Sequence, residues 1–537
     1  MFGILEPSGL ANPLDARGSA LLEETSSTAS DAFSKTAPGR PDLVLVPTPS
    51  DDPNDPLNWS RLRKEAAYVT LLAGTVLAGT CGPLVAPAFS QLAVELDRPL
   101  SQISQLNGAL VLTIGVGSVI FAPVQAKWGT RPSFLVAAFV AFIAQIWAGA
   151  SEKSFPSLLA ARCVQGLGMG CYFNNVPAAV NSLFFVHERG NRIAWWNLCL
   201  VGGINIGPVI SAQIIQYQSW PYAFWWQSLA GGLVFLATIA FVPELLYDRS
   251  YYDAEIARRR ELAAENTEDS TKTGEDKEAA LASVVHAPAV TSTTSRWSAY
   301  RFSTGVKTDK PFWRIFLQPL FYINSPVVIW ATLTFSVCFN LLPLAATVYS
   351  QIFSAPPYSM SVGAVGLVSG IPPLIGTLIG TVASGPVSDY VVKFLAKRNS
   401  GIYEPEYRLL VMVGFLVFGG IGFYGWGLQT SSSWVVPAIF IAILHVGVSC
   451  ATISCISYVT DAMREGAGDA IGLVVLIKSV IMFGLTSMVN DWYADRGPRQ
   501  FFVSLGSLVV ATSALAVPAW IWGKKARVWH SKHNYLE

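Results

Sequence analysis

Charged side chains are scarce in this sequence of 537 residues. Only 13% of the residues are Asp, Glu, Lys or Arg, whereas 52% are hydrophobic. Soluble globular chains carry roughly 25% charged residues. A core buried in water cannot account for that deficit over so long a chain, but a lipid-facing surface can. The composition therefore predicts an integral membrane protein, and the formal net charge of +1 gives no sign of a nucleic-acid partner.

The signatures of catalysis and metal binding are missing as well. The 7 cysteines form no CxxC pair and have no histidine at zinc spacing. The sequence has no Walker loop and no nucleophile constellation, and the glycines within apolar runs are spaced for helix packing rather than for holding a phosphate. We therefore expect no enzyme, no metal site and no organic cofactor.

Twelve apolar runs are long enough to cross a bilayer, whose core of about 30 Å needs roughly 20 helical residues. The first six are 68–89, 106–125, 134–150, 158–183, 194–215 and 222–242. The other six are 327–351, 365–384, 409–428, 435–459, 470–489 and 501–522. The sequence thus predicts an all-α integral membrane protein with twelve transmembrane helices in two six-helix pseudo-repeats.

Five regions follow from these runs. We expect a disordered cytoplasmic N-terminal tail, a first six-helix bundle, a cytoplasmic central loop, a second bundle and a cytoplasmic C-terminal tail, over residues 1–66, 67–243, 244–323, 324–523 and 524–537. The first residues do not read as a signal peptide, because no basic start leads into a short apolar run.

Lys and Arg set the predicted orientation. They gather in the loops that share a side with both termini, at Arg61, Arg63, Lys64, Lys127, Arg131, Arg189, Arg192, Lys393, Lys397, Arg398, Lys524, Lys525 and Arg527. The positive-inside rule places that side in the cytoplasm. We expect a multi-pass protein of the cell membrane, with the vacuolar membrane as the alternative.

Several motifs have the spacing of a known family. They are Asp55-Pro-Leu-Asn58-Trp59-Ser60 before helix 1, Arg162-x-x-Gln165-Gly166-x-Gly168 in helix 4 and Gly203-x-x-x-Gly207-Pro208 in helix 5. Over about residues 55–522 the chain resembles the major facilitator superfamily, and within it the fungal twelve-helix drug:proton antiporters. The resemblance implies secondary transport driven by a proton gradient.

One motif departs from the family pattern. In the loop after helix 2, Ala126 stands where the family usually has an aspartate that forms a gating charge pair. The resemblance therefore implies no standard gate in the first half. Asp389 occupies the corresponding loop of the second half and is the candidate for keeping that pair.

Small residues form stripes on helices 5 and 8. Gly203 and Gly207 lie four apart on one face of helix 5, as Gly376 and Gly380 do on helix 8. Such stripes let helices approach closely in lipid. We predict that the two helices pack across the halves through them and slide, with Pro208 adding a bend. Static packing is the alternative.

Arg162 and Gln165 are predicted to lie side by side, one turn inside the membrane. A charge there is costly and usually faces the protein interior, which favours a gate or a proton-linked site. The alternative is an arginine that extends to the outer headgroups.

Lys478 and His445 are the deepest titratable residues of the predicted helices. Nine residues of helix separate Lys478 from the membrane surface near Asp469, which places it near the midplane. We predict that Lys478 binds an anionic or carbonyl-bearing substrate or titrates during transport. His445 could carry protons. Either residue could instead be satisfied by nearby backbone groups.

Four asparagines complete the polar set of candidate substrate residues: Asn174, Asn175, Asn205 and Asn340. They could line a cavity or bridge helices by hydrogen bonds. No Asp or Glu lies deep in any predicted span. A binder of metal ions or polyamines would place one there, so the sequence favours neutral or anionic organic substrates.

The leading interpretation is a proton-coupled efflux pump for a small hydrophobic drug, toxin or secondary metabolite. The alternatives are proton-coupled uptake of a nutrient or cation and a non-transporting membrane sensor. The expected partners are a small organic substrate and the lipid bilayer, with no nucleic acid, and the expected state is a monomer.

Overall fold

The computed structural model describes residues 4–5, 19–21, 36–37, 40–44, 49–50, 52, 54–247, 299–303, 305–399, 402–429, 432–463 and 466–533. Most of the predicted N-terminal tail lies outside these ranges. So do residues 248–298 of the predicted central loop and the last four residues of the predicted C-terminal tail.

The first half of the molecule is built from six long helices. They are α1 (Arg61–Cys81), α3 (Leu100–Trp128), α4 (Thr130–Ala150), α5 (Phe155–Leu183), α6 (Val186–Tyr217) and α7 (Trp220–Phe241). The 3-10 helices η2 (Pro56–Asn58) and η3 (Ala86–Ala88) and the short helix α2 (Phe89–Glu95) flank α1. Each predicted span of this half falls on one of the long helices, apart from its boundaries.

The second half begins with two short elements, α10 (Phe312–Leu317) and η5 (Gln318–Asn324). Its spanning helices begin with α11 (Pro326–Ser354) and α12 (Val362–Arg398). A composite helix follows, made of η6 (Pro405–Val411), α13 (Met412–Gly414), η7 (Phe415–Gly419) and α14 (Gly420–Leu428). The last helices are α15 (Val435–Met463), α16 (Ala467–Ala514) and α17 (Ala516–His533).

Ten segments of the described chain are long and apolar enough to cross a membrane. Two features separate this number from the predicted twelve. The 29-residue helix α5, which contains Arg162, Gln165 and three asparagines, is not among the ten. The last segment, 467–530, holds two helices joined at Gly497, whose φ of 72° breaks the helix. The all-helical membrane architecture is confirmed, and twelve crossings stay a prediction.

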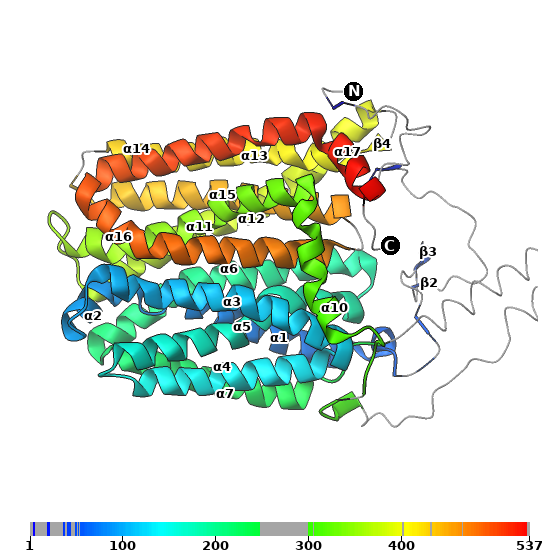
Figure 1. Ribbon diagram of the computed structural model, residues 1–537, viewed down its shortest axis with the longest axis horizontal. Helices are drawn as coiled ribbons and strands as arrows, with labels where there is room; N and C mark the ends of the chain where they lie inside the picture. The colour runs from blue at the N-terminus through cyan, green and yellow to red at the C-terminus, as the bar shows by residue number, and fades with distance from the viewer. Residues whose placement is uncertain are drawn as a thin grey trace, which may run out of the picture.

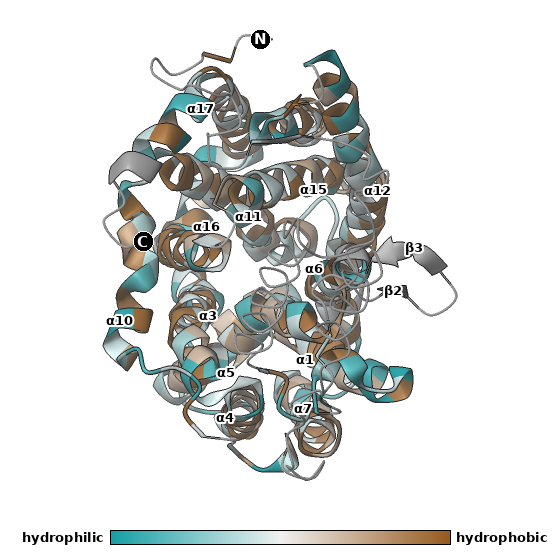
Figure 2. Ribbon diagram, turned by 90° about the vertical axis from the view of Figure 1, so that its right-hand side faces the viewer, coloured by the Kyte–Doolittle hydropathy of each residue, from teal (hydrophilic) through white to brown (hydrophobic). Residues whose placement is uncertain are grey.

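The long helices run side by side, and the two halves of the chain occupy opposite sides of the bundle (Figure 1). The view along the helices shows α4 and α7 at one edge and α17 at the other, with α6 and α3 near the middle (Figure 2). The buried apolar clusters follow the same division. One contains Phe134 and Tyr172 of the first half, and the largest contains Phe353 and Phe415 of the second.

The described N-terminal segments and the end of α17 lie at one end of the bundle, which we call the terminal end; the opposite end, with α2, is the far end (Figure 1). Described parts of the predicted N-terminal tail contact the second half at the terminal end. Ile4 is buried against Val392 and Tyr407, and β1 (Ala20–Leu21) pairs with β4 (Ile402–Tyr403). A second pair of strands, β2 (Thr36–Ala37) and β3 (Arg40–Val44), is antiparallel.

Several predicted boundaries differ from the structure. Helix 1 ends at Cys81 rather than at residue 89, because Gly82-Pro83 follows it and proline cannot continue the helical hydrogen bonds. Helix 1 also begins at Arg61, inside the predicted tail, and the predicted C-terminal tail is helical as far as His533. The predicted central loop contains α10 and η5.

A central cavity as candidate functional site

A cavity lies between the two halves, with about 930 Å3 of space between its lining atoms, including the part open to solvent. Helices α1, α3, α5 and α6 line it from the first half, and α11, α12, α15 and α16 line it from the second. The lining is mainly apolar, with seven polar side chains: Asn107, Asn205, Asn340, Tyr349, Ser369, His445 and Lys478. A concave apolar site with a few polar groups suits a small organic molecule.

Helices α6 and α12, the predicted helices 5 and 8, pack against each other across the halves. The contact is made by Gly366 and Gly370 of α12. A Cβ on Gly366 would come within 2.6 Å of the Pro208 carbonyl oxygen, and one on Gly370 would collide with the Asn205 carbonyl oxygen and with Val209. The absence of side chains here lets the two backbones approach closely.

The glycines that we predicted for this contact lie elsewhere. Gly203 and Gly207 face Val76 and Thr80 on α1, within the first half. Gly376 and Gly380 face Ala442 and Ser449 on α15, within the second half. The prediction of the helix pair is therefore confirmed, while the stripes assigned to it were wrong, since each joins helices of one half. Pro208 lies inside α6 and lines the cavity.

A second contact between the halves joins α3 to α16. The Ser104 hydroxyl donates to the backbone oxygen of Thr486 at 2.8 Å. A Cβ on Gly115 would come within 2.7 Å of the Ser479 Cβ, so this contact also depends on a missing side chain. The α3–α16 and α6–α12 contacts lie on either side of the cavity.

Polar contacts between the halves continue to the far end. The hydroxyls of Ser90 on α2 and Ser350 on α11 are 2.9 Å apart. Gln216, at the end of α6, accepts hydrogen bonds from the Gly363 backbone at 2.7 Å and from the Ser361 hydroxyl at 3.2 Å. These contacts hold the halves together at the far end of the cavity.

Lys478 faces the cavity, as predicted from its depth. Its side chain is 3% exposed, and its Nζ lies 4.2 Å from the centre of the Phe339 ring. The adjacent Asn340 donates from Nδ2 to the Lys478 backbone oxygen at 2.8 Å. Among the described residues, no carboxylate forms an ion pair with Lys478.

His445 and Asn205 also line the cavity. The Nδ1 of His445 lies 2.7 Å from the backbone oxygen of Ile441, one turn earlier on the same helix. A carbonyl can only accept, so this nitrogen carries the proton and Nε2 remains available to a ligand. Asn205 donates to the Thr377 hydroxyl at 3.0 Å, which joins α6 to α12.

Arg162 and Gln165 lie side by side, as predicted, but do not line the cavity. Arg162 is fully buried and donates to the backbone oxygens of Cys81 and Gly82, at 2.8 and 3.0 Å, and to Gln165 at 2.9 Å. Gln165 in turn donates to Gln227 on α7. These bonds satisfy carbonyls freed where α1 ends, and they contradict an arginine that extends to the lipid headgroups.

The other two asparagines are also outside the cavity lining. Asn175 is buried and donates to the Phe121 backbone oxygen at 2.9 Å, so it joins α5 to α3. Asn174 is partly buried near Gly472 of α16. Of the eight predicted substrate residues, the cavity thus brings together four: Asn205, Asn340, His445 and Lys478.

Asp389 has the charge partner that its motif implies. Its carboxylate lies 3.5 Å from Arg408 Nη1, and Arg408 also pairs with Asp461. Tyr403 hydrogen-bonds to the same Asp461. Burial and the Asp461 carboxylate raise the pKa of Tyr403 above its ordinary value, so its hydroxyl stays protonated and donates.

In the first half, Glu244 supplies a carboxylate near the loop that carries Ala126. Its oxygens accept from the backbone N–H groups of Thr130, Arg131 and Leu246, at 2.8, 3.3 and 2.9 Å. The first two belong to the first turn of α4, where an anion is favourable. A Cβ on Gly129, whose φ is 107°, would collide with this carboxylate.

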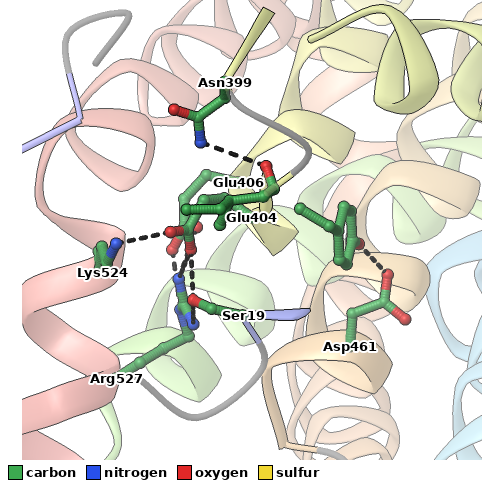
Figure 3. A network of polar contacts seen from close by, with 9 residues as sticks. Ser19, Asn399, Glu404, Glu406, Asp461, Lys524 and Arg527 are labelled. Carbon is green, nitrogen blue, oxygen red and sulfur yellow. Dashed lines mark hydrogen bonds and ion pairs between the residues drawn. The ribbon is translucent and has the colours of Figure 1, made fainter. Parts of the chain in front are cut away.

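A buried charge network lies at the terminal end of the second half (Figure 3). Lys524 pairs with Glu404 at 2.6 Å, and Arg527 pairs with Glu404 and Glu406 at 2.8 Å each. All four side chains are at most 1% exposed. Ser19 donates to Glu404 at 2.6 Å, so the N-terminal segment joins the network.

Sequence reasoning missed both this network and several cavity residues. Asn107 and Tyr349 stand within predicted spans, so their polarity was a usable signal for the cavity. The four network charges lie beside spans 9 and 12, where charged residues are expected at a membrane surface whether or not they pair. Their pairing depends on tertiary structure that the sequence pattern does not contain.

The sequence matches the profile of the Major Facilitator Superfamily over residues 71–484. Among curated proteins it is similar to protein HOL1 of Saccharomyces cerevisiae, with 24% identity, 94% of this chain and 92% of that protein covered. It is also similar to a probable efflux pump, mfs2, of Aspergillus flavus, with 24% identity and coverage of 83% and 98%.

Among solved structures, the fold is similar to that of a D-xylose–proton symporter. The TM-score is 0.55 and the sequence identity 14%, with 86% of this chain and 99% of that chain covered. At this identity the likeness concerns the fold alone. Together with the profile match over most of the chain, it shows that this multi-pass membrane protein belongs to the Major Facilitator Superfamily of transporters.

Proposed function

We propose that this protein is a proton-coupled exporter of a small, largely hydrophobic organic molecule. The observation that carries the proposal is the central cavity, which both halves line and which presents apolar side chains with few polar ones. Such a lining favours an organic substrate over a hydrated metal ion, which would call for carboxylate or carbonyl oxygen ligands.

Two observations support export as the direction of transport. The Gly203-x-x-x-Gly207-Pro208 pattern of α6 resembles the first part of the antiporter motif, although Ser211 and Ala212 replace its last two glycines. Relatives named as efflux pumps match most of the chain. In this proposal both termini are cytoplasmic, and the contacts at the far end close the cavity to the outside.

Alternating access would require the far-end contacts to separate. Those contacts consist of neutral hydrogen bonds and close backbone packing, with no ion pair between spanning helices of the two halves among the described residues. Neutral hydrogen bonds each contribute about 1 kcal/mol net. The halves can therefore part without separating buried opposite charges.

Proton coupling is assigned to the cavity. Among the described residues that line it, His445 and Lys478 carry the basic side chains that could exchange protons during transport. The protein acts as a monomer in this proposal, because the cavity is complete within one chain.

An accumulation assay tests the direction and the coupling. The full chain is expressed in a yeast strain that lacks its own exporters, and labelled toxins from a panel are measured inside the cells. Export predicts lower accumulation than in cells with empty vector, and a protonophore should abolish the difference. Faster entry of a labelled solute would instead establish uptake, and an unchanged difference with protonophore would refute proton coupling.

A further inference from the structure

The central cavity carries one positive group and no opposite charge to neutralise it. Of the described residues that line it, Lys478 is the one Lys or Arg, and none is Asp or Glu. The nearest charge-stabilising group recorded for the ammonium is the face of the Phe339 ring, 4.2 Å from Nζ to the ring centre. The charge is therefore only partly compensated.

A buried ammonium with no anionic partner is costly, because an apolar lining stabilises its charge less than bulk water does. A cation–π contact offsets less than the full desolvation penalty of a buried ion, so a difference remains. An anion that enters the cavity and reaches Nζ would restore much of this difference.

The rest of the lining indicates what the remainder of such a ligand looks like. Phe173 and Phe339 contribute aromatic side chains to the lining from opposite halves, on α5 and α11. The side-chain oxygens of Asn107 and Asn340 are buried, and no described residue forms a hydrogen bond with them. They can accept from a hydroxyl or N–H group of a ligand that reaches both halves.

We propose that the cavity binds an organic monoanion, a carboxylate on an apolar or aromatic body, whose charged group pairs with Lys478. This inference rests on the proposed function, because it takes the cavity to be the transport site. It narrows the substrate from a small hydrophobic molecule to one that carries a single negative charge. One lysine neutralises one charge, so a monoanion fits better than a dianion or a cation. A cationic amine would bring a second positive charge beside Nζ.

Binding of three matched probes tests the proposal. The purified full chain in lipid nanodiscs is titrated with 2-naphthylacetic acid, its amide and 2-naphthylethylamine, which share an aromatic body and differ in charge. The proposal predicts that the acid binds at least about tenfold more tightly than the amide, equivalent to about 1.4 kcal/mol. The amine should bind no better than the amide.

Variants locate the charge that is responsible. Lys478→Met should bind acid and amide equally, and Lys478→Arg should keep the preference for the acid. Lys153→Met is the matched control, because Lys153 is exposed in the loop between α4 and α5, and it should behave as the unmodified protein. Monodisperse elution and an unchanged melting temperature establish that each variant is folded.

Several results would overturn the proposal. They are equal binding of acid and amine, no acid binding at millimolar concentration, and an acid preference that persists in folded Lys478→Met. Binding in nanodiscs depends on neither direction nor proton coupling. A yeast assay that reveals uptake would therefore refute export and leave the anion site intact, whereas loss of acid preference would leave export intact.

Discussion

At the scale of single residues, Glu244 shows how a side chain near the end of one helix can fix the start of another. Its carboxylate accepts three backbone N–H groups and lies against Gly129, between α3 and α4. Hydrogen bonds to a charged acceptor contribute about 1.5–3 kcal/mol each. Glu244 thereby holds the connection in which the family aspartate is replaced by Ala126.

We therefore expect Glu244→Gln to destabilise the protein. The amide keeps the size and one acceptor oxygen but loses the charge at the helix start, at a cost of about 1–2 kcal/mol. The measurement is the melting temperature of the purified protein. Glu152→Gln, at an exposed position between α4 and α5, is the control, and an equal loss in both variants would contradict the role assigned to Glu244.

Lys478 and Arg162 show which structural properties of a residue its position in the sequence predicts. The depth of Lys478 followed from counting helical residues, and the structure places it in the cavity. The environment of Arg162 did not follow, because its partners are backbone carbonyls of Cys81 and Gly82, some eighty positions away. Depth is a property of one helix, whereas a partner depends on how helices pack.

At the scale of the helices, the difference between properties of one helix and properties of helix packing explains why the glycine stripes were assigned to the wrong contact. The order and placement of the spans followed from apolar runs, since lipid selects them directly. α12 carries small residues on more than one face, with Gly370 toward α6 and Gly376 toward α15. Periodicity identifies which residues share a face but not which helix covers it.

This geometry gives a sharp comparison within α12. Gly370→Ala places a methyl group against the Asn205 backbone oxygen and Val209, whereas a Cβ on Gly385 meets no atom within 4 Å. We expect Gly370→Ala to lower the transport rate at least about tenfold, with normal delivery to the membrane. A rise of about 1.4 kcal/mol in the rate-limiting barrier produces a tenfold loss of rate. Gly385→Ala should transport normally.

Transport by the two variants is compared at equal protein amounts in the membrane. Normal transport by Gly370→Ala would show that close approach of α6 and α12 is dispensable. An equal loss in Gly385→Ala would show that the effect comes from helix propensity rather than from the contact.

At the scale of the whole molecule, the far-end contacts predict a state that can be trapped. The Ser90 and Ser350 oxygens are 2.9 Å apart and belong to opposite halves. Changing both to cysteine should allow a disulfide that holds the far end closed. Because the halves could no longer part there, transport should fall to background and return when a reductant is added.

Each single cysteine variant is the control and should transport normally under oxidising conditions. The seven native cysteines are free. Cross-linking is measured as the altered gel mobility of protein cleaved between the halves. Full transport by a fully cross-linked double variant would refute the idea that the far end must open.

The buried charge network makes a separate prediction about stability at the terminal end. Arg527 pairs with Glu404 and Glu406, and all three are almost completely buried (Figure 3). Removing one partner of a buried ion pair costs about 3–5 kcal/mol, because the remaining charge is left without compensation. Arg527→Met should therefore lower the melting temperature strongly.

Arg499→Met serves as the control for that variant, since Arg499 is exposed at the far end and should change stability by less than about 0.5 kcal/mol. Similar melting temperatures for the two variants would mean that the network contributes little to folding.

The described ends of the connection between the halves meet at one place. The Glu244 N–H donates to the Ala299 backbone oxygen at 2.8 Å, although 55 positions separate them in the sequence. The chain between these points therefore has no distance to bridge, and its length is not dictated by the spacing of the halves. Domains are readily inserted where both ends of a segment meet. A fluorescent reporter with adjacent termini, placed after residue 248, should thus leave both bundles in register and report the membrane in which the protein resides.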